Sequence, residues 1–282
     1  MPRQKRVAAI HDISCFGRCS LTVALPIISA AGIETAVIPT AVLSTHTGGI
    51  SGYTFRDLTE DIIPIAEHWK SLNLEFDGFY TGFLGSFEQI DIVTEVCEKL
   101  RGNKTLLIVD PVMADNGVLY KIFPPNFPEG MRKLCSKANV IIPNITEAVF
   151  LLGEDYKEGP YTRDYIENLL RRLSALGPKQ VVLTGVYFDS GSLGAASYYA
   201  ETGEISYSFE KKIDGYFHGT GDVFGSALVA ALLKGKPLPF ATNTAVEFTV
   251  KSIERTKQAG TDIRFGVNFE EGLLELAKAL SE

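Results

Sequence analysis

The stretch Thr105–Asp110, which reads Thr-Leu-Leu-Ile-Val-Asp, is a short apolar run closed by an aspartate. A continuous apolar run is typical of a strand that is buried on both faces, whereas a half-exposed strand alternates apolar and polar residues. Other short runs along the chain also read as strands, most of them in the same continuous way: Arg6–Ile10, Glu34–Pro39, Asp77–Thr81, Val140–Pro143 and Gln180–Thr184. These runs predict a parallel sheet that is covered on both faces.

Segments with helical spacing lie between the expected strands. They are Leu21–Ala31, Ser86–Leu100, Ile145–Leu152 and Thr162–Leu176. The order strand, helix, strand predicts right-handed crossover connections and a doubly wound α/β sheet, with helices on both of its faces.

The pattern changes in the last third of the chain. Ala195–Ala200 and Ile205–Lys211 flank the turn Glu201–Glu204, which predicts an antiparallel hairpin at a sheet edge. Three more helical segments follow: Asp222–Lys234, Pro239–Gln258 and Phe269–Leu280. The proline-rich Phe123–Pro128 predicts a stiff surface connection, too short to be a domain linker. We therefore expect residues 1–282 to form a single domain.

Composition excludes several classes of protein. The 282 residues include 27 Lys and Arg against 34 Asp and Glu, and this net charge of −7 argues against a nucleic-acid-binding protein. The longest apolar stretch, Val223–Leu233, is much shorter than the roughly 20 residues that span a bilayer, so no membrane partner is expected. The basic start is followed only by Val7–Ile10, too short for the apolar region of a signal peptide. Four cysteines in a chain of this length do not form a disulfide framework, which predicts a reducing, cytoplasmic location.

The most informative motif is Gly219-Thr220-Gly221-Asp222, which directly precedes an apolar helix. Glycines let backbone N–H groups approach a ligand, and a helix start adds the positive end of its dipole, so the motif predicts an anion site. Asp222 could accept a proton from a hydroxyl group that attacks a phosphoryl group. The alternative is that Asp222 is only the N-cap of the helix. The chain has neither a Walker A sequence nor the dinucleotide-binding glycine pattern.

A second motif, Asp110–Asp115, follows one of the expected parallel strands. Carboxylates at the carboxyl end of such a strand face the crevice where parallel sheets bind ligands, and two of them suit Mg²⁺ held partly through water. The alternative is a structural turn, because Asp-Pro and Asp-Asn-Gly (Asp115–Gly117) favour turns.

Two other strand ends carry polar groups. Asn144 and Glu147 have the spacing of a capping box, which is the structural alternative to binding phosphate and the water shell of a metal. Thr184 ends another strand with a hydroxyl group placed for phosphate. By itself, His46 in the polar loop Ser44–Gly49 is expected to be a hydrogen-bonded loop residue, and the Cys15–Cys19 segment lacks the partners of a zinc site.

In combination, these motifs make the chain similar to the ribokinase-like superfamily, and within it to the pyridoxal and pyridoxamine kinases. The resemblance rests on six short motifs in one order along nearly the whole chain: His11–Ser14, Ser44–Gly48, Thr81–Gly85, Asp110–Met113, Pro143–Glu147 and Gly219–Asp222. It implies a three-layer sandwich with a mainly parallel central sheet, and a phosphotransferase that uses ATP and Mg²⁺ to phosphorylate the 5′-hydroxyl of a pyridoxal vitamer. It also implies a homodimer and leaves a monovalent-cation requirement open.

The resemblance assigns roles to particular residues. Asp222 would be the general base, and the backbone of Gly219, Thr220 and Gly221 would form the anion hole. Asp110, Asp115 and Glu147 would arrange Mg²⁺ and its waters. The residues expected near ATP are Asn144, Thr184, Tyr120, His218, Thr220 and Gly221. The residues expected near the substrate ring are Ser14, Thr47, His46 and Phe83, with Phe83 against the ring face.

Three alternatives remain at this point. A hydroxymethylpyrimidine kinase of the same superfamily would present a different heteroaromatic ring to the same chemistry. A sugar kinase is disfavoured because no long strand-rich insertion lies between Glu34 and Asp77. A non-catalytic vitamer-binding protein would not need the base, the anion hole and the metal carboxylates together.

Overall fold

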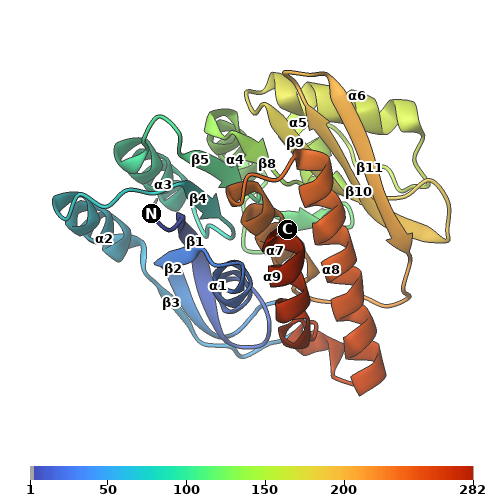
Figure 1. Cartoon of the computed structure of the whole chain (residues 1–282), viewed down its shortest axis with the longest axis horizontal. Helices are drawn as coiled ribbons and strands as arrows, with labels where there is room; N and C mark the ends of the chain where they lie inside the picture. Colours follow the sequence, from blue (N-terminus) through green and yellow to red (C-terminus); the bar gives the residue numbers. More distant parts are fainter. Residues whose placement is uncertain (1–2, 282) are drawn as a thin grey trace.

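The computed structural model describes residues 3–281, and its largest feature is a nine-stranded sheet with helices on both faces (Figure 1). The strand order is β11-β10-β9-β8-β5-β4-β1-β2-β3. The six strands from β9 to β2 are parallel to one another, and the remaining strands join the two edges in antiparallel orientation. The predicted fold class is therefore confirmed.

The parallel part of the sheet explains where a ligand can bind. Its strands are β1 (Arg6–Phe16), β2 (Glu34–Thr45), β4 (Gly78–Thr81), β5 (Leu106–Val109), β8 (Val140–Ile141) and β9 (Gln180–Val186). The chain runs first from β1 to β2 on one side and then returns to β4 on the other side of β1. Such sheets bind ligands beyond the carboxyl ends of the strands where this direction reverses, which here is between β1 and β4.

Two strands run further than the sequence predicts. β1 continues past Ile10 to Phe16, and β2 continues past Pro39 to Thr45. β1 pairs with β4 only up to Ile10 and Thr81, and beyond that point its ladder partner is β2, with one isolated bridge between Ile13 and Ser20. The extensions therefore form an arm of β1 and β2 beyond the carboxyl edge of the sheet, next to the reversal point, and residues 55–57 add a short third strand to it.

The sequence predicted the strands at one edge of the sheet but not the strand at the other. β10 (Ser192–Tyr199) and β11 (Glu204–Lys211) confirm the predicted antiparallel hairpin. The opposite edge carries β3 (Phe55–Asp57), which was not predicted because its three residues are all exposed. A separate small hairpin is formed by β6 (Ala114–Asp115) and β7 (Val118–Leu119).

One face of the sheet is covered by α1 (Leu21–Ala30), α7 (Thr220–Leu233), α8 (Leu238–Ala259) and α9 (Leu273–Ser281) (Figure 1). α7 packs against the other three helices and is apolar on nearly all sides, which is the pattern of a buried helix. The predicted last helix begins later than expected, because Glu270–Gly272 forms a separate 3₁₀ turn. A second 3₁₀ turn, Ile263–Phe265, precedes it.

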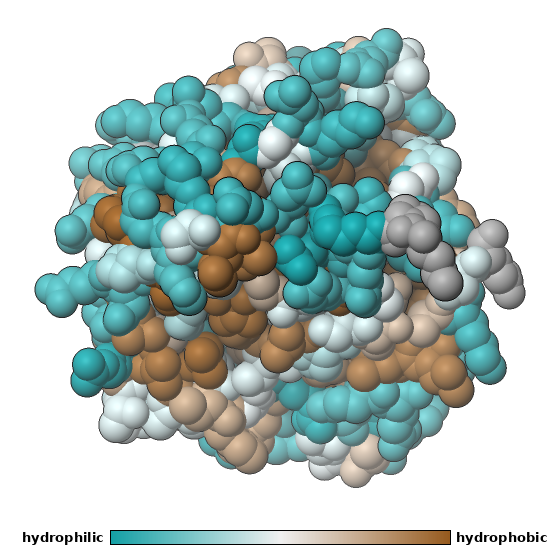
Figure 2. All heavy atoms as spheres, turned by 60° about the vertical axis from the view of Figure 1, so that its left-hand side comes forward, coloured by the Kyte–Doolittle hydropathy of each residue, from teal (hydrophilic) through white to brown (hydrophobic). Residues whose placement is uncertain are grey.

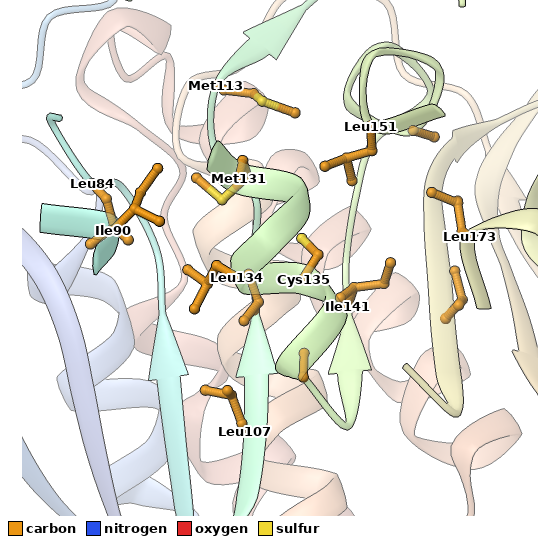
Figure 3. Packing of buried hydrophobic residues seen from close by; sticks show 14 of the residues in the cluster. Leu84, Ile90, Leu107, Met113, Met131, Leu134, Cys135, Ile141, Leu151 and Leu173 are labelled. Atoms are coloured by element: carbon orange, nitrogen blue, oxygen red, sulfur yellow. The ribbon is translucent and has the colours of Figure 1, made fainter. Parts of the chain in front are cut away.

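The opposite face is covered by α2 (Thr59–Ser71), α3 (Phe87–Leu100), α4 (Phe127–Lys137), α5 (Ile145–Leu152) and α6 (Arg163–Ala175). Of these five helices, α2 and α4 were not predicted. Figure 3 shows side chains of α4 packed over β5 and β8 in the core of this face, with Met131, Leu134 and Cys135 near Leu107 and Ile141.

The predicted surface connection at Phe123–Pro128 is confirmed for residues 124–126, which are exposed and lie outside any helix, but not for its two aromatic ends. The side chains of Phe123 and Phe127 are buried, with 7% and 0% exposure, and their rings stack 3.9 Å apart. Pro128 lies in the first turn of α4, where a helix needs no N–H donor and tolerates proline. The segment is therefore a short exposed connection that leads into a helix and is anchored at both ends by buried rings.

Hydrophilic side chains predominate on the face drawn in Figure 2, and hydrophobic residues form scattered patches between them. Across residues 3–281, no helix has both the length and the apolar composition needed to cross a membrane.

Candidate active site

The start of α7 forms a turn with free backbone donors. Gly219 is the N-cap, with φ 71°, and no side chain caps the helix. A Cβ at position 219 would lie 2.0 Å from the carbonyl oxygen of Arg18, so only glycine fits there. The helix begins at Thr220, which leaves the N–H groups of its first turn available to an anion. The alternative interpretation of Asp222 as the N-cap is therefore wrong.

Asp222 lies in the first turn of α7, and its surroundings favour a proton acceptor that works near neutral pH. Burial raises the pKa of Asp222 to about 7, the backbone N–H of Ser20 counteracts this by favouring the ionised form, and the charge of Asp12 raises it further. A general base is most effective when its pKa lies near the working pH. Ser20 has φ 55°, an uncommon backbone conformation for a residue with a side chain.

Asp110 and Glu147 are buried acids on neighbouring elements, with 8% and 3% exposure. Burial raises the pKa of both groups, and the charges of Glu147 and Asp222 raise that of Asp110 further. Glu147 accepts hydrogen bonds from the backbone N–H of Met113 (3.1 Å) and of Asn144 (2.9 Å). The two acids therefore lie together without a compensating positive charge, a situation that a cation would relieve.

Asn144 has the structural role that the capping-box spacing predicts. Its side chain accepts from the Glu147 N–H at 2.9 Å and donates to the carbonyl oxygen of Ala114 at 2.8 Å. Asn144 also forms a parallel bridge with Thr184, whose side chain is half-buried at the end of β9. The structure thus brings these two expected phosphate contacts side by side.

Asp115 lies in the tight turn of the β6–β7 hairpin, in which Asn116 and Gly117 have positive φ. The turn interpretation of Asp115–Gly117 is therefore confirmed. The carboxylate of Asp115 also accepts a hydrogen bond from the hydroxyl of Tyr216 at 2.8 Å. Desolvation and the charges of Glu147 and Asp115 raise the pKa of Tyr120, which places that hydroxyl beside the same acids.

His46 and His218 come from distant parts of the chain and lie together. Their ring centroids are 5.0 Å apart, and a Cβ at Gly48 would lie 2.7 Å from the His218 ring. His46 is buried, accepts the N–H of Gly48 at Nδ1 and binds the carbonyl oxygen of Arg264 through Nε2. The expectation of a hydrogen-bonded loop histidine is thus confirmed. Burial and the charge of His46 lower the pKa of His218.

The remaining expected substrate residues lie in different surroundings. Ser14 is fully buried, and its hydroxyl donates to Asp12 at 3.3 Å. Thr47 is exposed in the loop after β2. Phe83 is half-buried and packs against Phe123, with ring centroids 5.6 Å apart. No contact described within residues 3–281 joins Phe83 to the carboxylates, so its expected position against a substrate ring stays a prediction.

Two residues of this site were missed by the sequence analysis. Asp12 is 5% exposed and interacts electrostatically with Asp222, and Ser20 forms hydrogen bonds to both carboxylates. The available signal was an acidic residue directly after an expected strand, as at Asp110. Asp12 was overlooked because β1 was expected to end at Ile10 and, of the His11–Ser14 motif, only Ser14 was assigned a role.

The site has a strong excess of negative charge. None of its five acids forms an ion pair with a lysine, an arginine or a histidine of residues 3–281: Asp12, Asp110, Asp115, Glu147 and Asp222. In the same part of the chain, no three acidic, histidine or cysteine side chains are placed as a complete metal-ligand set. The arrangement suits cations that arrive with much of their own shell, as Mg²⁺ does with its waters.

Comparison with known proteins gives a consistent result. The family model described as phosphomethylpyrimidine kinase matches residues 25–266. A pyridoxine kinase of Bacillus subtilis is 31% identical over 187 residues, which cover 64% of this chain and 65% of that protein. A pyridoxal kinase of Arabidopsis thaliana is 32% identical over 266 residues, which cover 82% of this chain and 81% of that protein.

A solved structure matches over nearly the whole length. It is a Bacteroides thetaiotaomicron protein assigned as a phosphomethylpyrimidine kinase and crystallised with pyridoxal. It is 37% identical to this chain, covers 98% of it and 96% of its own length, and superimposes with a TM-score of 0.92. The similarity therefore includes every element that carries the acidic site.

Proposed function

The chain belongs to the phosphomethylpyrimidine kinase family, and on that premise we propose that it is a pyridoxal kinase of the ribokinase-like fold. It transfers the γ-phosphoryl group of ATP to the 5′-hydroxyl of pyridoxal, pyridoxine or pyridoxamine, giving the 5′-phosphate and ADP. The observation that carries the chemistry is a carboxylate with a pKa of about 7 at the uncapped start of α7.

Asp222 is the general base in this proposal. It accepts the proton of the 5′-hydroxyl while the hydroxyl oxygen forms its bond to the γ-phosphorus and the bond from phosphorus to the ADP oxygen breaks. Transfer is direct and in line, with no phosphorylated enzyme, so positioning and electrostatics supply the catalysis. The uncapped N–H groups at Thr220 and Gly221 support a role in stabilising the charge that builds on the phosphoryl oxygens.

Asp110, Glu147 and Asp115 would hold Mg²⁺, in large part through water. The fit is supported by the chemistry of the donors, because all three are carboxylates and the two buried ones have raised pKa values in the absence of a cation. When bound, Mg²⁺ neutralises charge on the ATP phosphates. Asn144, Thr184, Tyr120 and His218 would position those phosphates and the rest of the nucleotide.

The substrate would lie on the side of the β1–β2 arm. Ser14, His46 and Thr47 come from that arm or the loop that follows it. His218 contacts His46 and directly precedes Gly219, so the loop after β2 adjoins the anion hole. Phe83 follows β4 and would lie against the ring. This arrangement would present the 5′-hydroxyl to Asp222.

A hydroxymethylpyrimidine kinase is the second candidate, because the matching family model is described as phosphomethylpyrimidine kinase, and both names specify a pyrimidine ring. The two candidates share the base, the anion hole and the metal carboxylates, and they differ in the ring that is bound. The B. thetaiotaomicron structure with pyridoxal favours the pyridine ring.

Side-by-side rates test the proposal. Purified protein with ATP and Mg²⁺ is given each pyridoxal vitamer or hydroxymethylpyrimidine, and the phosphorylated product is measured by mass spectrometry. We expect a higher kcat/KM for at least one vitamer than for the pyrimidine, and no product when Mg²⁺ is chelated. Preference for the pyrimidine would support the second candidate, and tight vitamer binding without transfer would indicate a binding protein. Light scattering checks the predicted homodimer.

A further inference from the structure

Tyr80 carries a buried hydroxyl group that packing alone does not explain. The residue lies in β4 with 0% exposure, and its ring belongs to the apolar layer between the sheet and α7. Within residues 3–281, the hydroxyl oxygen forms no hydrogen bond. A buried polar group without a hydrogen bond destabilises a fold, and phenylalanine would fill the same space without that oxygen. The hydroxyl therefore calls for a role other than filling the core.

Gly225 of α7 makes room for this hydroxyl. A Cβ at position 225 would lie 2.3 Å from the hydroxyl oxygen of Tyr80, so any other residue would displace it. The backbone itself does not require glycine there, because the φ of Gly225 is not positive. Inside a helix, glycine is less stable than alanine. Two locally unfavourable choices, a glycine within a helix and an unpaired buried hydroxyl, therefore coincide at one place.

The gap at Gly225 also opens toward Asp110. Oδ2 of Asp110 lies 3.6 Å from the same Cβ position, so the hydroxyl and the carboxylate border one small gap. They come from neighbouring strands, since β4 and β5 are paired up to Thr81 and Val109, and Asp110 follows directly. Desolvation and the charges of Asp110 and Asp222 raise the pKa of Tyr80. The hydroxyl therefore stays protonated at neutral pH and can act toward these acids as a donor.

The other neighbours of the hydroxyl do not account for it. The ring of His11 packs edge-on against the Tyr80 ring, with centroids 4.5 Å apart, and burial lowers the pKa of His11 to about 3, so this histidine is neutral. The hydroxyl of Ser226 lies near that of Tyr80, and it is buried without a hydrogen bond of its own. Neither neighbour brings a charge that a phenol would balance. The acids beyond Gly225 do.

We propose that Tyr80 is a positioning residue, whose hydroxyl donates a hydrogen bond to Asp110 and holds this carboxylate toward the cation when the cation is bound. The inference rests on the proposed function for the identity of the cation, Mg²⁺. It adds to that function a residue that contacts neither the substrate nor the metal. Glycine at position 225 is then the condition under which the hydroxyl reaches the carboxylate.

The contact affects cation binding more than turnover. Groups that hydrogen-bond to a metal ligand fix its orientation, and their loss lowers metal affinity by about ten- to hundredfold. We expect the lower end of this range, because Asp110 would hold Mg²⁺ in large part through water. Once the cation is saturating, the base and the anion hole are unchanged, so kcat should be nearly that of wild type.

The test compares wild-type protein with Tyr80→Phe, which removes one oxygen atom and keeps the ring. Binding of Mn²⁺, a paramagnetic substitute for Mg²⁺, is measured by electron paramagnetic resonance in the presence of ADP. Kinetics give the Mg²⁺ concentration at half-maximal rate and kcat at saturating Mg²⁺. We expect the Mn²⁺ dissociation constant and the Mg²⁺ requirement to rise by about tenfold, with kcat within about threefold of wild type.

Tyr198→Phe is the matched control. Tyr198 lies in β10, where it pairs with Val181 near the start of β9, so it is at the opposite end of the strands from the acids. Loss of this hydroxyl should leave Mn²⁺ binding, the Mg²⁺ requirement and kcat unchanged.

Gly225→Ala tests the geometry from the other side of the gap. Its methyl group would displace the Tyr80 hydroxyl but would meet Asp110 only in ordinary contact, at 3.6 Å. We expect a loss of Mn²⁺ affinity similar to that of Tyr80→Phe. The double variant should bind Mn²⁺ no more weakly than Tyr80→Phe alone, because the same hydrogen bond is lost only once. Losses that add up in the double variant would contradict the proposal.

Thermal unfolding separates this role from a structural one. Tyr80→Phe removes an unpaired buried hydroxyl, so its melting temperature should equal or exceed that of wild type. A lower melting temperature with unchanged Mn²⁺ affinity would indicate a structural hydroxyl and overturn the proposal, as would unchanged affinity at any melting temperature. If Tyr80→Phe folds poorly, Gly225→Ala is the second variant that withdraws the hydroxyl from Asp110.

The proposed function can fail separately from this inference. Failure of wild type to phosphorylate any vitamer would contradict the proposed function. Binding of Mn²⁺ in the presence of ADP needs no acceptor alcohol, so it still decides the role of Tyr80.

Discussion

Acidic residues lie at both ends of the parallel strands, but in opposite surroundings. At the amino ends, Asp77 precedes β4 and accepts hydrogen bonds from Arg3, Lys5 and the backbone N–H of Arg6, each at 2.9 Å. Burial alone would raise the pKa of Asp77, yet these partners lower it. At the carboxyl ends, burial raises the pKa values of Asp110 and Asp222, and neither has a cationic partner.

This difference separates a carboxylate that holds the fold together from carboxylates kept ready for a ligand. At the amino ends, the negative charge of Asp77 is balanced by Arg3 and Lys5 of the same chain. At the carboxyl ends, the charge of the buried acids has no partner within residues 3–281, and in the proposed function a metal ion or a proton balances it. If these acids served only the stability of the fold, we would expect each of them to have a cationic partner, as Asp77 does.

The largest expected effect comes from Asp222→Asn, which removes the proposed base and keeps its shape. Turnover should fall by about 10²- to 10⁴-fold, the usual contribution of a general base, while ATP still binds. The measurement is steady-state kcat together with nucleotide affinity.

The same variant should melt at a higher temperature than wild type at pH 8, because it removes a buried charge. If the rates stay close to wild type, the carboxylate at position 222 is not the base and has only a structural role, as Asp77 has. Asp91→Asn, at an exposed position of α3, is the control for the loss of one carboxylate.

The second test is the dependence of rate on pH. The pKa of Asp222 is raised from 3.8 to about 7, so below pH 7 the folded protein holds this group protonated and unable to accept a proton. kcat/KM should therefore fall by about tenfold for each pH unit below 7 and level off above it. The profile is measured at saturating Mg²⁺.

The free energy of unfolding should change with pH in the opposite direction to the rate. Asp222 contributes stability that is fully present below pH 3.8 and is lost as the pH rises through about 7. Asp222→Asn should remove that part of the pH dependence of the melting temperature. A rate profile that is flat between pH 5.5 and 8 would contradict the assignment of Asp222 as base.

The third test concerns packing beneath the site. Gly225 of α7 lies against the hydroxyl of the fully buried Tyr80, and an added Cβ would meet that oxygen at 2.3 Å. Gly225→Ala should therefore lower the free energy of unfolding by about 1 to 3 kcal/mol. Chemical denaturation measures the change.

The double variant Gly225→Ala/Tyr80→Phe provides the control. Without the hydroxyl, the nearest Tyr80 atom is the ring carbon at 3.3 Å, so most of the lost stability should return. Equal destabilisation in both backgrounds would mean that α7 needs this glycine for another reason.

The smallest effect is expected at the paired end of the strands. Asp77→Asn should lower the free energy of unfolding by about 1 kcal/mol, since its partners Arg3 and Lys5 are largely solvated, and should leave kcat unchanged. The pKa of Asp77 is lowered, so its contribution is present above pH 3.8 and is lost as the pH falls below that value. If Asp77→Asn lost activity without losing stability, the proposed difference between the amino and carboxyl ends of the strands would be contradicted.

Much of this fold is readable from the sequence because its central strands are buried on both faces. A run such as Thr105–Asp110 can be recognised as a strand without knowing which strands it pairs with. The elements that were missed lack such a signal: β3 is short and exposed, and α4 begins in a segment whose prolines suggest a loop. In these cases the tertiary environment, and not local preference, selects the structure.

The residues of the candidate site also fall into those that the sequence predicts and those that only the structure reveals. Asp110, Glu147 and Asp222 follow from their positions at strand ends and at a helix start, and the structure brings them together. Asp12 could not be assigned from spacing, because its position depends on where β1 and β4 separate. The contact between His46 and His218 joins two loops that no local pattern connects.

The bonds from His46 to the carbonyl oxygen of Arg264, and from the Arg18 N–H to that of Phe265, have a consequence for biosynthesis. The loops that meet the substrate in the proposed function lie in the first fifth of the sequence, and the anchor of His46 is translated 218 residues after it. A nascent chain that has emerged only through α8 holds the nucleotide-facing elements but leaves these loops untethered. If the proposed function holds, competence to bind the vitamer should therefore appear only after Arg264 and Phe265 have left the ribosome.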